Sequence, residues 1–192
     1  MFKQKVVALS AAFDVAYECG HSAAITSDGQ LFTWGSAVNG RLGHGEEALV
    51  CPPRVMISTL PSCDPHCARQ DDQLTPRLVE ALEGKQVVAV AASNTHMVAC
   101  TGSGELWNWG FLQTTVYTPR LVQGMVGRKV VAVAAGWHYT AVVTDDGELW
   151  SFGNNSKGQL GLGHKEDQYL PQRVSMQEQH SQLLVLILLS CR

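Results

Sequence analysis

The stretch KVVAVAAGWHYTAVVTDDGELWSFGN, residues 129–154, holds the pattern from which the fold follows. Two runs rich in Val, Ala and Thr, Val130–Ala135 and Tyr139–Thr144, are each six residues long, which is typical of strands and too short for helices. Asp146-Gly147 supplies the positive φ that a two-residue hairpin turn requires, and Leu149–Phe152 then returns as a third strand. The stretch therefore predicts three antiparallel strands in succession.

The same pattern occurs three times along the chain. The six residues Val-Val-Ala-Val-Ala-Ala begin at Val130 and also, 43 residues earlier, at Val87. A less regular first copy begins near Ala12. In every copy the glycine of an aromatic-Gly pair lies six residues after the turn glycine: Gly35 after Gly29, Gly110 after Gly104 and Gly153 after Gly147. A period in the range of about 20 to 50 residues indicates a repeat architecture.

The repeat predicts nine strands. Each unit contributes a Val- and Ala-rich first strand, a second strand that begins near a His or Tyr, and a third strand that ends in an aromatic residue. The expected strands are Val15–Tyr17, Ser22–Thr26, Leu31–Trp34, Val87–Ala92, His96–Cys100, Leu106–Trp109, Val130–Ala135, Tyr139–Thr144 and Leu149–Phe152. Because Trp34, Trp109 and Phe152 share one repeat position, we expect all three side chains to be buried between adjacent sheets.

The first strand of each unit has no polar face, so we expect it to be buried on both sides by neighbours that come close. Such a strand, repeated at this period, suits the inner region of a β-propeller, where four-stranded sheets converge on an axis. A solenoid is the rival, but its usual repeats are shorter and do not need two hairpin strands with a long return. The fold class predicted is all-β, a partial β-propeller.

Glycine-rich segments strengthen this interpretation. Asn39–Gly45 and Asn154–His164 follow the third strands of two units, and Pro53 and Pro171 each lie 18 residues after the aromatic-Gly pair. With the second-strand opening Gly136–Thr140, these motifs resemble the regulator of chromosome condensation (RCC) repeat family. Its unit carries a hydrophobic strand, G-x-x-H-[ST], a D-G turn, L-x-x-W-G, N-x-x-G-Q-L-G and P-x-x-V. The resemblance covers roughly residues 12–174 and implies RCC-type blades of four strands.

The chain departs from that family in its number of units. Members of that family usually close a ring of about seven blades, whereas this chain carries about three units and so predicts an incomplete ring. The second unit runs from Gly110 to Pro119 without a glycine-rich loop, and Gln73–Pro76 resembles an additional unit ending. We interpret residues 1–192 as one partial propeller, with units at about 12–55, 76–122 and 124–174, an irregular insertion at 56–75 and a tail outside the repeat at 175–192.

Composition and charge exclude several classes of partner. The net charge is −3 and Lys and Arg do not cluster, so the chain has no electrostatic footprint for nucleic acid or for an anionic membrane. The apolar run Leu183–Leu189 is too short to span a bilayer, which requires about 20 residues. The N-terminal sequence lacks the pattern of a signal peptide. We expect an intracellular protein, cytoplasmic or nuclear.

No motif specifies bond-making chemistry. Cys63–Cys67, with Cys51 upstream, has a C-x3-C spacing outside the usual zinc patterns and no second ligand pair, so reduced thiols are favoured over a zinc site. His21 and His96 occupy one repeat position, which favours a structural role for both. The glycine-rich loops lack the Gly-Lys-[Ser/Thr] ending of a phosphate-binding loop. We therefore predict no catalytic, cofactor-binding or metal-binding residues and no enzymatic activity.

The glycine-rich loops are the best candidates for contact with a partner. Such loops wrap the edge of a blade, with glycines at positive φ, and can present side chains outward. His44 and His164 have a second interpretation as local turn formers. The candidate partner-binding residues are Asn39, Arg41, His44, Asn155, Lys157 and His164.

The resemblance implies two classes of function. The first, which we favour, is a protein-interaction module that docks a partner through propeller loops, as in ubiquitin ligases and kinases that carry such repeats. The second is guanine-nucleotide exchange on a small GTPase, the activity of the founding member. A remote third is ultraviolet-B photoreception, because Trp137 lies in a G-W-x-x-T segment similar to that of the plant receptors. The expected partner is a small GTPase or a component of a ubiquitin or kinase pathway.

The incomplete ring also predicts self-association. In a closed propeller each sheet packs against two neighbours, so three units leave one apolar sheet face uncovered at each end. Exposed apolar faces of that kind drive association between copies.

Overall fold

The structure, a computed structural model, describes residues 5–14, 19–45 and 72–176. Within these ranges the chain forms twelve strands and three 3-10 turns, η1 (Val38–Gly40), η2 (Glu80–Leu82) and η3 (Gln123–Met125). The described helices are therefore single short turns, and none has the length and apolar character that crossing a membrane requires.

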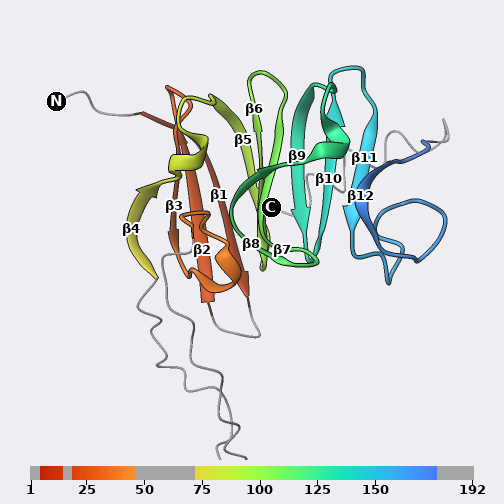
Figure 1. Cartoon of the computed structure of the whole chain (residues 1–192), viewed down its shortest axis with the longest axis horizontal. Helices are drawn as coiled ribbons and strands as arrows, with labels where there is room; N and C mark the ends of the chain where they lie inside the picture. Colours follow the sequence, from red (N-terminus) through yellow and green to blue (C-terminus); the bar gives the residue numbers. More distant parts are fainter. Residues whose placement is uncertain (1–4, 15–18, 46–71, 177–192) are drawn as a thin grey trace, which may run out of the picture.

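The strands form three four-stranded antiparallel sheets that lie side by side in chain order, here called blades 1, 2 and 3 (Figure 1). In each blade the order in space is the order along the chain, and strands that follow one another are hydrogen-bonded neighbours. Blade 1 contains β1 (Val6–Asp14), β2 (Cys19–Thr26), β3 (Leu31–Gly35) and β4 (Gln73–Leu78). Blade 2 contains β5 (Val87–Ala92), β6 (His96–Thr101), β7 (Leu106–Phe111) and β8 (Thr115–Leu121). Blade 3 contains β9 (Val130–Gly136), β10 (Tyr139–Thr144), β11 (Leu149–Gly153) and β12 (Gln168–Arg173).

This arrangement confirms the predicted fold class. The described residues are all-β, and the inner strands contact one another in sequence, β1 with β5 and β5 with β9. The three sheets do not close a ring, so the molecule is a partial propeller (Figure 1). Eight of the nine predicted strands coincide with β2, β3, β5, β6, β7, β9, β10 and β11.

The first strand of blade 1 begins earlier than the sequence pattern indicated. The predicted strand at 15–17 lies outside the described residues, and the strand that pairs with β2 is β1, with Val6 opposite Thr26. Val6 thus takes the place that Val87 takes opposite Thr101 in blade 2. The turn glycine follows 23 residues after Val6 but only 17 after Val87. The longer β1–β2 hairpin explains why this copy was out of register.

The fourth strand of blade 1 comes from the segment that resembled an additional unit ending. Thr33 of β3 pairs with Arg77 of β4, and in blade 3 Ser151 pairs with Gln172 of β12 in the same register. Residues 46–71, which include Pro53 and most of the predicted insertion at 56–75, lie outside the described residues. The bounds of the three units stay a prediction.

The apolar core lies between the blades and consists of two clusters. Each cluster combines side chains from one face of a blade, the 3-10 turn that follows that blade, and the facing strands of the next blade. The cluster between blades 1 and 2 contains Ala23, Ile25, Leu31, Val79, Leu82, Val87, Met97, Ala99 and Trp109. The cluster between blades 2 and 3 contains Val98, Cys100, Leu106, Val122, Met125, Val130, Val142 and Phe152.

The aromatic residues at the ends of the third strands are not equally buried. Trp109 is 1% exposed and Phe152 is 2% exposed, which confirms the prediction at these two positions. Trp34 is only partly buried, so the prediction is wrong there. Trp109 and Phe152 pack into the clusters on the side of the preceding blade. Blade 1 has no preceding blade among the described residues, and Trp34 therefore lacks this cover.

The inner strands are more exposed than predicted. Val7, Val88 and Val131 are 57%, 55% and 47% exposed, whereas the sequence predicted strands buried on both sides. β1, β5 and β9 are edge strands of their sheets. No described strand pairs with their outer edges, so these strands are less covered than strands inside a sheet.

Candidate functional site

The glycine-rich segment of blade 1, residues 38–45, is here called the blade 1 loop. It packs against β7 and β8 of blade 2. The indole Nε1 of Trp109 donates a hydrogen bond to the carbonyl of Arg41, with an N···O distance of 2.9 Å. A Cβ atom at Gly43 would lie 2.8 Å from that Nε1, so only glycine fits there, and its φ of +77° also favours glycine. The loop thus covers the outer side of the interface between blades 1 and 2.

The corresponding segment of blade 3, residues 154–167, is here called the blade 3 loop. Its centre is the side chain of Asn155, which is fully buried. Nδ2 of Asn155 donates to the carbonyls of His164 and Glu166, at 2.8 and 3.1 Å. The backbone N–H of the same residue donates to Oδ1 of Asp167, at 2.7 Å. These bonds hold the loop in one compact conformation.

An aspartate closes each loop, and sequence reasoning missed both. Oδ1 of Asp72 accepts a hydrogen bond from the backbone of Ala37 at 3.0 Å, as Oδ1 of Asp167 does from Asn155. This backbone hydrogen bond is the largest cause that lowers the pKa of Asp167. Both aspartates directly precede a fourth strand. The signal was present as Asp-Gln-x-x-Pro, which occurs at 72–76 and at 167–171.

The six candidate partner-binding residues fall into a buried group and an accessible group. Arg41 and Asn155 are 0% exposed, and both bond within their own loops. The Nε2 atom of partly buried His44 lies 2.8 Å from Oγ1 of Thr33.

The remaining three candidates reach the surface to different degrees. Asn39 is partly exposed and has a φ of +61°. Lys157 and His164, in the blade 3 loop, are exposed. In this structure these two side chains are the most accessible of the six.

Buried histidines lie where adjacent blades meet. His96 bonds through Nδ1 to Oγ of Ser93 at 2.7 Å and through Nε2 to Oγ1 of Thr140, in blade 3, at 2.9 Å. Burial, with the nearby charges of His138 and His21, lowers the pKa of His96 to about 3. The ring is therefore neutral at physiological pH and joins blades 2 and 3, as the repeat position predicted.

His21 occupies the same position in blade 1 but has a different environment. Burial, followed by the charge of Arg41, lowers its pKa to about 3. Within the described residues neither ring nitrogen has a hydrogen-bond partner. The residue of blade 2 that corresponds to Thr140 is Met97, whose side chain cannot replace the hydroxyl.

An exposed aromatic cluster lies at the end of the molecule where the blade 3 loop begins. The ring of Trp137, 63% exposed, stacks on that of His138, with centroids 5.9 Å apart and an angle of 23° between planes. The ring of Phe111 meets His138 edge-on, with a centroid distance of 5.7 Å and an angle of 82°. Nδ1 of His138 lies 3.1 Å from Oγ1 of Thr95, which fixes the ring. Phe111, Trp137 and His138 are called the aromatic cluster below.

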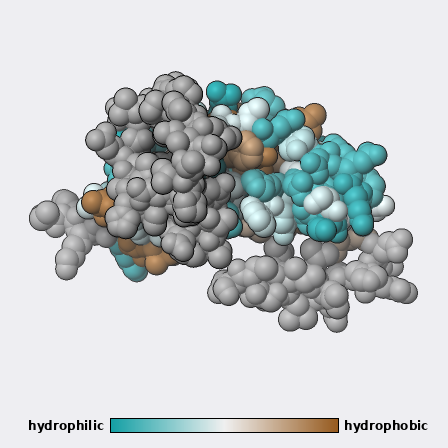
Figure 2. All heavy atoms as spheres, turned by 90° about the horizontal axis from the view of Figure 1, so that it is seen from below, coloured by the Kyte–Doolittle hydropathy of each residue, from teal (hydrophilic) through white to brown (hydrophobic). Residues whose placement is uncertain are grey.

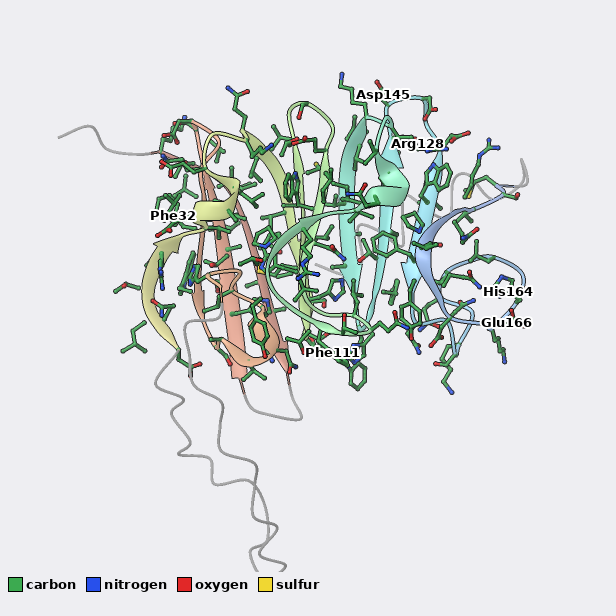
Figure 3. All side chains as sticks on the ribbon, viewed as in Figure 1. Phe32, Phe111, Arg128, Asp145, His164 and Glu166 are labelled. Carbon is green, nitrogen blue, oxygen red and sulfur yellow. The ribbon has the colours of Figure 1, made fainter. Side chains whose placement is uncertain are left out.

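The figures place this cluster within the molecule. Figure 3 shows Phe111 at the lower end, opposite Arg128 and Asp145 at the upper end. Seen from below in Figure 2, hydrophobic surface adjoins hydrophilic surface in the described part of this end. The ring that packs on Trp137 belongs to a histidine, whereas the photoreceptor interpretation would require stacked tryptophans.

The upper end carries charged side chains that contact an aromatic ring or one another. The guanidinium of Arg128 lies 4.3 Å from the ring centroid of Trp150, and Nζ of Lys129 lies 3.9 Å from Oδ2 of Asp145 (Figure 3). Both members of the ion pair are about half exposed, and exposed pairs of this kind contribute little to stability.

Metal ligands do not gather in the part of the chain that the structure describes, where no three His, Cys, Asp or Glu residues are placed to share an ion. The Cys51 and Cys63–Cys67 motif lies outside the described residues. Cys100 is buried in the core, and burial raises the pKa of its thiol.

Comparison with known families agrees with three propeller blades of this design. The sequence profile of the regulator of chromosome condensation (RCC1) repeat matches residues 28–100 and 146–183. A second profile of the same repeat matches residues 130–159. The chain belongs to the RCC1 repeat family.

Individual relatives share this repeat within longer chains. E3 ubiquitin-protein ligase HERC2 of Homo sapiens is 35% identical over 108 residues, which cover 55% of this chain and 2% of the ligase. Human WBSCR16 superposes with a TM-score of 0.67 at 23% identity, over 90% of this chain and 40% of that one. Prp20p of Saccharomyces cerevisiae superposes with a TM-score of 0.64 at 20% identity, over 81% and 36%. The chain thus spans less than half the length of each of these proteins.

Proposed function

We propose that this chain is a protein-interaction module that docks a partner through its lower end. The observation that carries the proposal is the aromatic cluster, in which Trp137 is 63% exposed although its ring stacks on that of His138. Tryptophan is among the residues that most often dominate the energy of protein interfaces. An aromatic side chain that is already ordered also loses little entropy on binding.

The blade 3 loop extends this surface. The backbone N–H of Asn154, at the start of the loop, donates to the carbonyl of His138 at 2.8 Å. The loop therefore leaves the blade directly beside the aromatic cluster and carries the exposed side chains of Lys157 and His164. Rigid blades that present accessible loops suit a docking role, because function in repeat folds resides in grafted sites.

The class of partner follows from the family. HERC2 is an E3 ubiquitin-protein ligase, and Prp20p has binding properties toward Gsp1p and histones. We propose a protein partner, either a component of a ubiquitin or kinase pathway or a small GTPase. Guanine-nucleotide exchange on such a GTPase is the alternative function.

Quantitative affinity purification from cells tests the proposal with two matched variants. Trp137→Ala removes the exposed ring, and Val126→Ala removes an exposed apolar side chain elsewhere, 57% exposed. We expect Trp137→Ala to reduce recovery of specific partners by about tenfold or more, the effect of losing an interface hot spot, and Val126→Ala to leave recovery unchanged. Equal recovery with both variants would refute the assigned surface. Accelerated release of fluorescent GDP from small GTPases would favour the exchange alternative.

Self-association belongs to the same proposal, because the described residues contain no further blade beside the first and the last. On blade 1, Val6 is 50% exposed and Trp34 is only partly buried. We expect sedimentation velocity of the isolated chain to show dimers or larger species. A single monomeric species at tens of micromolar would contradict this expectation.

A further inference from the structure

Blade 2 lacks the loop that blades 1 and 3 carry. β7 ends at Phe111 and β8 begins at Thr115, so three residues, 112–114, join the strands directly. The blade 1 loop covers the outer side of the first interface, but no loop of blade 2 covers the second. A cavity of about 280 Å³ lies there, between blades 2 and 3. This volume is close to the lower end, about 300 Å³, of the range for ligand pockets.

The cavity occupies the place that a loop of blade 2 would fill. The blade 1 loop packs on Trp109 and Tyr117 of blade 2. The register of the sheets assigns Phe152 and Tyr169 to the same positions in blade 3, and both line the cavity. The cavity wall on blade 3 is therefore equivalent to the surface of blade 2 that binds the blade 1 loop. Blade 2 has no loop that could occupy it.

The two loops that are present show what such a surface binds. The buried Leu42 of the blade 1 loop has a carbonyl that accepts a hydrogen bond from Oγ1 of Thr33 at 2.7 Å. In blade 3 the carbonyl of the buried Leu160 accepts from Oγ of Ser151, also at 2.7 Å. The corresponding residue of blade 2 is Asn108, which lines the cavity. Its Nδ2 can donate to a carbonyl in the same way.

The chemistry of the lining narrows the class of ligand. None of the described residues that line the cavity is charged, and apolar side chains outnumber polar ones, with Leu112, Phe152 and Leu170 among them. Such walls do not compensate the desolvation of a phosphate or carboxylate. Phe152 also lacks the N–H that Trp109 donates to the blade 1 loop, so that hydrogen bond has no counterpart in the cavity.

We propose that this cavity binds a leucine-bearing turn of a partner protein. The leucine side chain packs against Phe152 and Leu170, and the leucine carbonyl accepts a hydrogen bond from Nδ2 of Asn108. The partner protein thus contributes to the second interface a turn of the kind that the blade 1 loop contributes to the first. The inference rests on the proposed interaction role but concerns a second surface, separate from the aromatic cluster.

A peptide taken from the chain's own blade 1 loop is a suitable probe. Residues 36–45, with a fluorophore at the N-terminus, are titrated with the 192-residue chain, and binding is followed by anisotropy. We expect saturation with a Kd on the order of 10–500 µM, as for short peptides with one apolar anchor. A peptide with Leu42→Asp should bind at least about tenfold more weakly, because it would place a charge in an apolar site. Absence of saturation up to about 1 mM would overturn the proposal.

Variants of the protein locate the bound peptide. Leu170 is 69% exposed, so Leu170→Glu leaves the fold intact, which thermal unfolding verifies. We expect Leu170→Glu and Asn108→Ala each to weaken peptide binding about tenfold, and Val126→Ala to have no effect. Unchanged binding to Leu170→Glu would overturn the assignment.

The same variants separate this inference from the proposed function. If Trp137→Ala abolishes peptide binding and Leu170→Glu does not, the peptide lies on the aromatic cluster; this inference then fails and the proposed function stands. If Trp137→Ala leaves partner recovery unchanged while Leu170→Glu weakens peptide binding, the aromatic cluster is not the docking surface but the assignment of the cavity holds. Loss of self-association in Leu170→Glu would place a loop of a second copy in the cavity and overturn the assignment to a partner protein.

Discussion

The two interfaces between blades use the same strands but place their polar contacts differently. Both share a backbone link near the hairpin turns, where Val87 donates to the carbonyl of Gly29 at 2.9 Å and Val130 donates to that of Gly104 at 3.0 Å. Between blades 1 and 2 a further buried hydrogen bond joins Trp109 to the blade 1 loop. Between blades 2 and 3 there is no such loop, and a buried histidine bonds to a threonine across the interface.

This difference shows that equivalent repeat positions share their backbone conformation but not the side-chain hydrogen bonds that join adjacent blades. Where Trp109 bonds to the loop, Met97 takes the repeat position of Thr140, and His21 makes no hydrogen bond within the described residues. Where Phe152 replaces the tryptophan, His96 bonds to Thr140. Each interface therefore has its own buried side-chain hydrogen bond across the blades, and both bonds lie near the end of blade 2 where β6 begins and β7 ends.

Among single substitutions, the largest effect is expected from removal of the tryptophan in the first interface. Trp109 is 1% exposed and donates to the carbonyl of Arg41, so Trp109→Ala should lower the free energy of unfolding by about 3–5 kcal/mol. Urea denaturation followed by circular dichroism measures the loss. Trp34→Ala is the matched control, because Trp34 has the same repeat position but is only partly buried, and it should cost about 1–2 kcal/mol. Equal losses would mean that a neighbour covers Trp34 after all.

The strands of the blades could be predicted from the sequence, but the contacts between the blades could not. Strands with small and β-branched residues, turn glycines and terminal aromatics are local signals, so blades 2 and 3 could be located from them. The first strand was missed because an extended hairpin moved Val6 out of the expected spacing. The exposure of Trp34 depends on what lies beside blade 1, and a local pattern carries no information about a neighbour.

The candidate site was predictable only in part. The glycine-rich loops were found from their motif, yet Arg41 and Asn155 proved to be buried residues that hold the loops together. Polar residue type alone does not reveal which way a side chain points. The aromatic cluster and the cavity both depend on contacts between blades, namely His138 with Phe111 and Leu170 beside blade 2. Such contacts join residues far apart in sequence.

Acid is expected to destabilise the chain through its two buried histidines. His21 and His96 both have a pKa lowered from 6.5 to about 3, so the unfolded chain binds protons that the native chain does not. Stability is therefore complete above about pH 6.5 and falls as the pH decreases toward 3, by up to about 1.4 kcal/mol per pH unit for each histidine. The pKa values of Asp146 and Asp167 are lowered from 3.8, so their contribution is lost only at more acidic pH.

Urea denaturation at intervals between pH 7 and 4 measures this slope. We expect His21→Leu, which removes one of the two titrating rings, to reduce the slope by about half within that window. A stability that does not change from pH 7 to 4.5 would contradict neutral, buried histidines.

A smaller effect is expected from the polar link of the second interface. Thr140→Val keeps the shape of the side chain but removes the hydroxyl that lies 2.9 Å from Nε2 of His96. The ring nitrogen is then buried without a partner, which should cost about 1–3 kcal/mol at pH 7.5. The same substitution at Thr118, which is exposed on β8, is the control and should change stability by less than about 0.5 kcal/mol. A loss at Thr140 no greater than at Thr118 would show that the hydrogen bond between blades contributes nothing.

The smallest effect is expected from the histidine that makes no such link. His21 is 2% exposed, and its ring nitrogens have no partner within the described residues, so the native state already bears the cost of burying them. An apolar side chain of similar size removes that cost, and His21→Leu should therefore change the free energy of unfolding at pH 7.5 by no more than about 1 kcal/mol, in the stabilising direction. His96→Leu should instead destabilise the chain by about 1–3 kcal/mol, because it leaves Ser93 and Thr140 without their partner. The two histidines share one repeat position. Opposite signs in these two measurements would therefore show that the hydrogen bonds of His96, and not the position itself, stabilise the chain. A loss for His21→Leu as large as that for His96→Leu would mean that the ring in blade 1 is stabilised after all.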